Sequence, residues 1–127
     1  MDNENGQLGS IKIDNEVLGT IAGIAAKEIP GVHKITTSLV GGLTQLIKKM
    51  PDAGIKVVVR ENEVSFELGV VVEYGFDIPE ITYQIQKKIK EEVEKMAGLK
   101  VVKVDVVVHG IHHTRGKTKG EKEEKND

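Results

Sequence analysis

The middle of the chain alternates apolar and polar residues with the period of a β-hairpin. Between residues 55 and 60 every second position is apolar, and the same period resumes after a polar turn at residues 61–63. Alternate side chains of a strand point to opposite faces, so a period of two predicts two strands that each bury one face. The predicted buried face consists of Ile55, Val57, Val59, Val64, Phe66, Leu68, Val70, Val72 and Tyr74.

Two other stretches repeat apolar residues every three or four positions, which predicts amphipathic helices. The longer one begins at residue 78, with Pro79 in its first turn, and ends before Gly98. The shorter one covers residues 17–28, is followed by Pro30 and Gly31, and is rich in small residues that favour close packing. The predicted core positions are Val17, Leu18, Ile21, Ile24, Ala25, Ile78, Ile81, Ile85, Ile89, Val93 and Met96.

Three further stretches are candidates for strands. Residues 10–14 alternate polar and apolar side chains before the first helix, and residues 32–37 follow that helix. Residues 99–108 form the last strand, with Val102, Val104, Val106 and Val108 on one side and Lys103 and Asp105 on the other.

The resulting order, β-α-β-β-β-α-β, predicts an α+β fold in which two helices pack on one face of a mostly antiparallel sheet. We expect a flexible arm at residues 1–8, one domain at 9–114 and a disordered charged tail at 115–127. Residues 38–53, with a weakly helical segment at 43–50, form a mobile connection in this interpretation. On the polar side of the sheet, Val71 and Val107 are candidates for a contact surface.

Composition narrows the classes of function. The 127 residues fit a single domain, and the lack of cysteine excludes disulfides, thiolate metal sites and thiol nucleophiles. A net charge of −2, two Phe, two Tyr and no Trp argue against nucleic acid as a partner. The polar start of the chain lacks a signal-peptide pattern, and no apolar run approaches the roughly 20 residues of a membrane helix, so we expect a cytoplasmic protein without direct membrane insertion.

The segment Arg115-Gly116-Lys117-Thr118 suggests a phosphate-binding loop, but the spacing fails. Such a loop needs a glycine five residues before the second one, where this chain has Ile111, and no helix is predicted to follow. We therefore interpret the segment as part of a solvated tail.

His109, His112 and His113 are the candidate metal ligands at the end of the last strand. Because alternate side chains of a strand share a face, only His109 and His113 should lie on the same side, and two ligands are too few for a zinc site. His33 stands alone on its strand. Ordinary exposed histidines are the favoured interpretation.

Glu67 and Glu73 are the nearest approach to a catalytic carboxylate pair. They are six residues apart on one strand, about 20 Å, which is too far to share a reaction centre. We therefore assign no catalytic, cofactor-binding or metal-binding residue and expect neither enzymatic activity nor a cofactor.

Several short motifs, in order, resemble the alkaline shock protein family, the envelope stress response proteins of Gram-positive bacteria. They begin with Gly9-x-Ile11-x-Ile13 and Glu16-Val17, and continue with Ala25-Ala26-x-Glu28-x-x-Gly31-Val32, Val72-x-Tyr74-Gly75-x-x-Ile78, Met96-x-Gly98-Leu99-x-Val101 and Val104-x-Val106-x-Val108-x-Gly110. Each motif is weak alone, but together they cover about residues 9–111. The chain departs from the family pattern at Pro30 and in its histidine-rich end.

The resemblance implies a non-enzymatic cytoplasmic scaffold or adaptor in envelope stress response or homeostasis. It implies protein–protein binding, a membrane-anchored protein partner that holds the chain peripheral to the membrane, and self-association as a homo-oligomer. The alternative is a small regulatory protein linked to lipid metabolism that binds nucleic acid or a metabolite.

Overall fold

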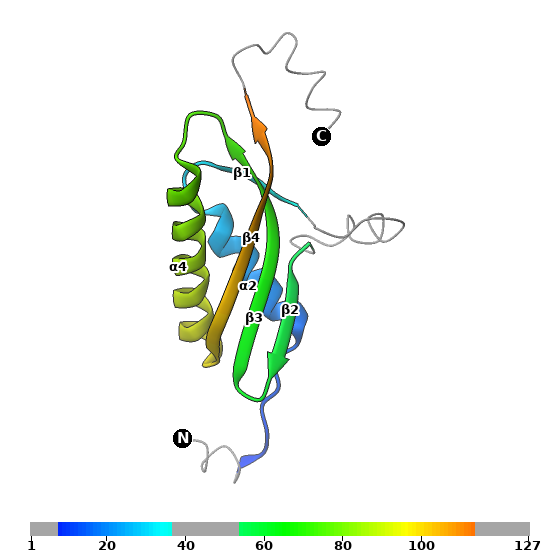
Figure 1. Ribbon diagram of the computed structural model, residues 1–127. Helices are drawn as coiled ribbons and strands as arrows, with labels where there is room; N and C mark the ends of the chain where they lie inside the picture. The colour runs from blue at the N-terminus through cyan, green and yellow to red at the C-terminus, as the bar shows by residue number, and fades with distance from the viewer. Residues whose placement is uncertain (1–7, 37–53, 114–127) are drawn as a thin grey trace, which may run out of the picture.

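The computed structural model describes residues 8–36 and 54–113, which form two helices and a four-stranded sheet (Figure 1). The elements are α2 (Asn15–Lys27), β1 (Val32–Thr36), β2 (Lys56–Arg60), β3 (Glu63–Glu73), α4 (Ile78–Ala97) and β4 (Lys100–His112). This confirms the α+β class, with two helices on a mostly antiparallel sheet. Residues 1–7 of the predicted arm, the predicted connection at 38–53 with its 43–50 segment, and the tail at 115–127 lie outside the described residues.

Strand β3 is the centre of the sheet. Along one edge it pairs antiparallel with β2 through residues 63–67 and with β1 through residues 69–72. Along the other edge it pairs parallel with β4 over residues 63–73. The parallel pairing requires a crossover, which α4 provides.

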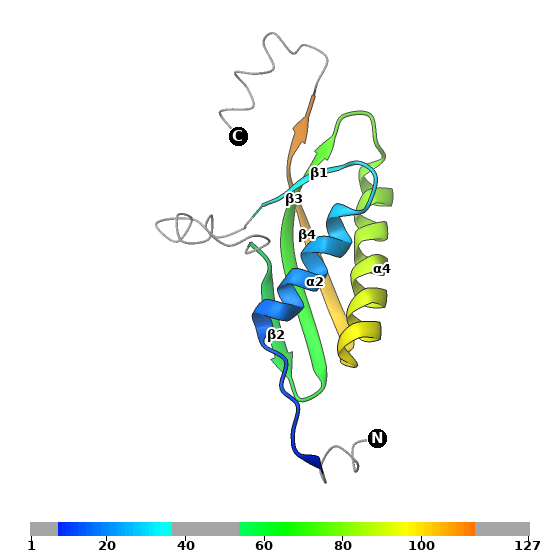
Figure 2. The same cartoon turned by 180° about the vertical axis from the view of Figure 1, so that it is seen from behind.

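The core lies between the sheet and the two helices, and Figure 2 shows α2 lying across the sheet beside α4. The predicted period of two is correct for β3, whose alternate residues Val64, Phe66, Leu68, Val70 and Val72 are at most 1% exposed. Four residues of α4 meet them, Ile81, Ile85, Ile89 and Val93. None of the helices within the described residues is both long and apolar enough to cross a bilayer.

Polar side chains of α4 bond to the outer edge of β4. Gln86 donates to the carbonyl of Val104 at 3.0 Å, and the backbone N–H of Val101 donates to Glu94 at 3.0 Å. The ammonium of Lys90 lies 2.8 Å from Glu94 and lowers the pKa of that carboxyl, as does the Val101 hydrogen bond. These bonds occupy backbone groups that an unprotected edge strand would offer to another chain.

The strand expected at residues 10–14 is absent. Ile11 is 75% exposed, and Ile13 packs against the core without a strand partner. The outer edge of β2 is instead contacted by the first residue of α2, since the Asn15 amide donates to the Val57 carbonyl at 3.4 Å. Two alternating isoleucines indicate which side of an extended segment is apolar, but they do not specify the strand with which it would pair.

Helix α2 buries its small residues rather than all of its large ones. Leu18, Gly19, Ala22, Gly23, Ala25 and Ala26 are buried. By contrast, Val17 and Ile24, predicted to be core residues, are about half exposed, and Met96 and Tyr74, also predicted on buried faces, are 62% and 63% exposed. The small face allows a close approach to β2, because a Cβ placed at Gly19 would lie 3.6 Å from the Val57 side chain.

The two helices begin at aspartates that differ in one hydrogen bond. The Asp77 carboxylate accepts the backbone N–H of Glu80 at 3.1 Å, whereas the side chain of Asp14 makes no capping bond. We expect Asp77→Ala to lower the free energy of unfolding by about 1 kcal/mol, and Asp14→Ala to lower it clearly less. Thermal melts of both variants measure the difference, and equal losses would show that the Asp77 bond contributes nothing.

Candidate functional site

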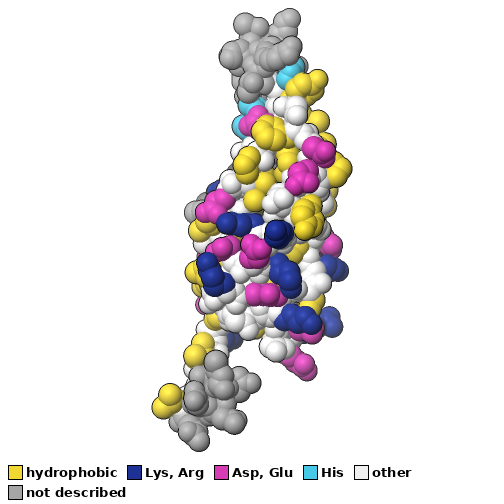
Figure 3. Space-filling view, turned by 90° about the vertical axis from the view of Figure 1, so that its left-hand side faces the viewer, with side chains coloured by type: hydrophobic (Ala, Val, Ile, Leu, Met, Phe, Trp, Pro, Cys, Tyr) yellow, Lys and Arg dark blue, Asp and Glu magenta, His cyan; other side chains and the backbone are white. Residues whose placement is uncertain are grey.

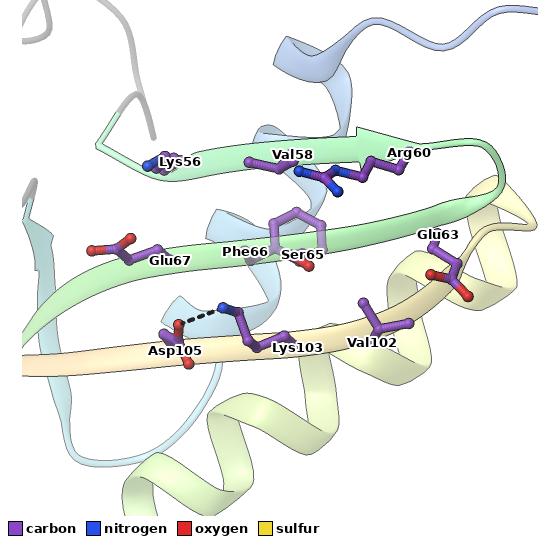
Figure 4. Close-up of a pocket in the computed structure, with 10 residues that line it drawn as sticks. All are labelled: Lys56, Val58, Arg60, Glu63, Ser65, Phe66, Glu67, Val102, Lys103 and Asp105. Atoms are coloured by element: carbon purple, nitrogen blue, oxygen red, sulfur yellow. Dashed lines mark ion pairs between the residues drawn. The ribbon is translucent and has the colours of Figure 1, made fainter.

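Within residues 8–36 and 54–113, both helices lie on one side of the sheet and no element covers the opposite face (Figures 1 and 4). A shallow hollow on this face is lined by side chains from three strands. They are Lys56, Val58 and Arg60 of β2, Glu63, Ser65 and Glu67 of β3, and Val102, Lys103 and Asp105 of β4; Phe66 of β3 also borders the hollow, but its side chain is buried. We call this surface the open face.

Charges of both signs are arranged in rows on the open face. The two basic residues of β2 lie opposite acidic residues of β3, with Lys56 in register with Glu67 and Arg60 in register with Glu63. On β4 the ammonium of Lys103 lies 3.6 Å from the Asp105 carboxylate, and both side chains are more than half exposed. Exposed pairs of this kind contribute little to stability, so these side chains can turn toward a partner at small cost.

Exposed valines lie between the charges. Val58, Val102 and Val107 are 40%, 47% and 40% exposed. Of the two valines predicted as candidates for a contact surface, Val107 is exposed here, whereas Val71 is only 5% exposed. Val102 was expected on the core side and lies on the open face, because β4 carries one extra residue there and the register shifts.

A second, more apolar hollow lies where α2 ends and α4 begins. It is lined by Ile29, Pro30, Phe76, Asp77, Glu80, Ile81 and Gln84. Phe76 and Tyr74 are 48% and 63% exposed at this end of the molecule. Figure 3, which faces α4, shows hydrophobic side chains gathered toward the start of the helix and both signs of charge interspersed along it.

Two histidines and a glutamate meet at the end of the sheet where β3 and β4 finish. His33 Nδ1 lies 3.0 Å from one oxygen of Glu73, and His112 Nδ1 lies 3.0 Å from the other. The imidazole rings are stacked, with centroids 3.8 Å apart and an angle of 8° between the planes. We call these three residues the His–Glu cluster.

Glu73 is ionised in the cluster at neutral pH. The hydrogen bond from His112 lowers the pKa of its carboxyl most, and the hydrogen bond from His33 lowers it further, while partial burial acts in the opposite direction. The cluster is partly accessible, with about a third of the Glu73 and His33 side chains and 12% of the His112 side chain exposed.

Two β-bulges bring the cluster together. His33 is the extra residue of β1 opposite β3, and His109 is the extra residue of β4. After the bulge at His109, the faces of β4 exchange, so that His112 lies in register with Glu73. The prediction that only His109 and His113 share a face was therefore wrong. His33 is the one histidine of β1, as expected, but Glu73 of β3 and His112 of β4 lie beside it. Gly110 was the available signal, because a glycine inside a strand often marks a bulge.

The other predicted candidates lie apart from this cluster. The ring of His109 covers Gly69, where an added Cβ would collide with it. His113 lies beyond β4 and packs against Tyr74, with ring centroids 4.5 Å apart. Glu67 belongs to the open face, and residues 115–118 lie outside the described residues.

Comparison with known proteins identifies relatives over most of the chain. The model of the alkaline shock protein 23 family, described as having a cell envelope-related function, matches residues 3–113. The sequence is 30% identical over 112 residues to the uncharacterized protein YqhY of Bacillus subtilis, covering 87% of this chain and 83% of that one. It is 28% identical over 105 residues to a stress response regulator gls24 homolog of Streptococcus pyogenes, covering 81% of this chain and 59% of that one.

A solved structure shares the fold without close sequence similarity. A variant of the MamM CTD superposes with a TM-score of 0.54 at 11% identity, covering 76% of this chain and 95% of that one. At this level of identity the likeness concerns the fold alone.

Proposed function

Because the chain belongs to the alkaline shock protein 23 family, whose members have a cell envelope-related function, we propose that it is a non-enzymatic scaffold or adaptor in the envelope stress response. The names of its relatives support a stress-related role. Its work in this proposal is to bind another protein, and the binding surface is the open face.

The observation that carries the proposal is the composition of the open face. Among the described residues no helix covers it, and it presents rows of opposite charge separated by exposed valines. Mixed charge around apolar contacts is the usual anatomy of a protein–protein interface, in which the charges set register and orientation. The partner is accordingly a protein surface with complementary charges of both signs.

We further propose that this partner is anchored in the membrane and that the chain stays on the cytoplasmic side, peripheral to the bilayer. An envelope role supports this location. Self-association through the same face is the competing arrangement, since a second copy would also present charges of both signs.

The test exchanges charges without changing net charge. Lys103→Asp with Asp105→Lys reverses one ion pair on the open face. Lys87→Glu with Glu91→Lys is the matched control, because it exchanges two exposed residues of opposite charge one turn apart on α4. Tagged full-length chains are cross-linked in native cells under envelope stress, and the captured membrane proteins are compared. We expect the wild type and the α4 control to capture the same partner and the open-face variant to lose it.

Three results would overturn the proposal. Retention of the partner by the open-face variant, with loss in Phe76→Ser, would place the interface at the start of α4. A wild-type dimer that the open-face variant alone dissociates, with no other protein captured, would make a second copy the occupant. Steeply salt-dependent binding of RNA or DNA by the pure chain would favour the regulatory alternative.

A further inference from the structure

The His–Glu cluster places three metal-binding side chains within reach of one ion. His33, Glu73 and His112 come from three different strands, and their donor atoms all lie within 4.8 Å of one another. Both histidines present Nδ1 to the carboxylate, each at 3.0 Å from a separate oxygen. The two histidines are 40 and 39 positions from Glu73 in sequence, so the fold brings the three donors together.

The chemistry of the donors selects the class of ion. Neutral imidazole nitrogens suit zinc and neighbouring transition metals, whereas magnesium and calcium prefer all-oxygen sets. Two imidazoles and one carboxylate are a known zinc donor set that leaves a fourth position open. We propose that His33, Glu73 and His112 bind one divalent transition-metal ion, with Zn²⁺ as the expected occupant.

Binding requires only a local rearrangement. With zinc–ligand bonds of 2.0–2.1 Å, neighbouring tetrahedral donors lie about 3.3 Å apart. Each Nδ1 now lies 3.0 Å from its own carboxylate oxygen, and the three donor atoms lie within 4.8 Å of one another, so they must draw together around one point. The nearly parallel rings must also splay, because stacked imidazoles point their Nδ1 lone pairs side by side rather than at one point. Loss of the ring stacking is therefore part of the proposal.

The backbone supports this assignment. One of the two histidines is itself the extra residue of a bulge, and the other reaches the face of Glu73 because of a bulge three residues earlier. Bulges re-aim side chains and are enriched beside functional sites. The exposed third of the His33 and Glu73 side chains leaves the fourth position accessible to water or to a donor from another molecule.

The competing interpretation is a purely hydrogen-bonded cluster, in which each Nδ1–H donates to Glu73 and no ion is needed. The two interpretations differ in what zinc does to the wild-type protein. A metal takes the Nδ1 lone pair of each ring, so the ring proton must lie on Nε2 instead and both imidazoles stay neutral. The imidazole nitrogen resonances of His33 and His112 must therefore shift together, while those of His109 and His113 stay in place.

The experiment uses the full chain, treated with a chelator and then dialysed. Zinc chloride is titrated by calorimetry at neutral pH and, in parallel, followed through the imidazole nitrogens by NMR. We expect saturation at one ion per chain, paired shifts at His33 and His112, and no comparable binding of magnesium. The NMR arm uses only wild-type protein, so it remains decisive if a variant fails to fold.

Variants then assign the ligands. Glu73→Gln keeps the shape of the side chain and removes its charge, and His33→Ala removes a ligand that is a third exposed. Loss of a supporting residue around a metal ligand already weakens affinity by about 10–100-fold, so we expect each of these to weaken zinc binding at least tenfold. His113→Ala and Glu67→Gln are the matched controls and should bind like the wild type, since neither residue belongs to the cluster or to the two bulges.

Several outcomes would overturn the assignment. These are the absence of saturable zinc binding, shifts at His109 or His113 in place of His33 and His112, or undiminished binding by Glu73→Gln.

Discussion

Ile85→Asp should unfold the domain. Ile85 is fully buried in the layer between α4 and the sheet, and the substitution both leaves a cavity and places a carboxylate in an apolar environment. Each effect alone costs several kcal/mol. Their sum is comparable to the free energy of unfolding of a typical domain, about 5–15 kcal/mol. We expect circular dichroism at 25 °C to show loss of the helical signal.

Tyr83→Asp is the control for this experiment. Tyr83 lies on the same helix two residues earlier and is 54% exposed, so the same new charge remains in water. Its free energy of unfolding should change by about 0.5 kcal/mol or less. Val104 faces the same apolar layer from the sheet and is 8% exposed. Val104→Asp should therefore also unfold the domain. A native spectrum for Ile85→Asp would contradict its assignment to the core.

Gly31→Ala should be much more destabilising than Gly75→Ala. Both glycines have a positive φ of about the same size, 100° and 99°, so the backbone strain of an added side chain is similar. A Cβ at Gly75 would meet no atom within 4 Å. A Cβ at Gly31 would lie 2.7 Å from Ile81 and 2.8 Å from Phe76, well inside van der Waals contact.

The pair therefore separates strain from collision. We expect Gly75→Ala to cost about 1–3 kcal/mol through its backbone alone, and Gly31→Ala to cost about 1–3 kcal/mol more through overpacking. Urea unfolding of both variants measures the difference in midpoint. Equal midpoints would mean that Ile81 and Phe76 move aside freely, and that the junction between β1 and α4 is loosely packed.

Most of the fold could be predicted from the sequence because its determinants are local. The isoleucines of α4 recur at a helical period, and alternate residues of β3 are apolar, so each element's type and buried face can be read within one stretch of chain. The same reasoning failed at residues 10–14, where the alternation is real but the chain has no sheet partner. It also failed for Val17 and Ile24, because a close approach to the sheet selects the small face of α2 over the larger side chains.

The candidate sites depend on tertiary structure for a different reason. The open face could be expected from the alternation of apolar and polar side chains along β3. The position of Val102 could not, because it depends on a bulge in β4 that appears only in the pairing with β3. The His–Glu cluster depends on two such bulges and on three strands meeting at one end of the sheet. A single extra residue exchanges the faces of a strand, so His33, Glu73 and His112 carry no common signal along the chain and become neighbours only through the register of the folded sheet.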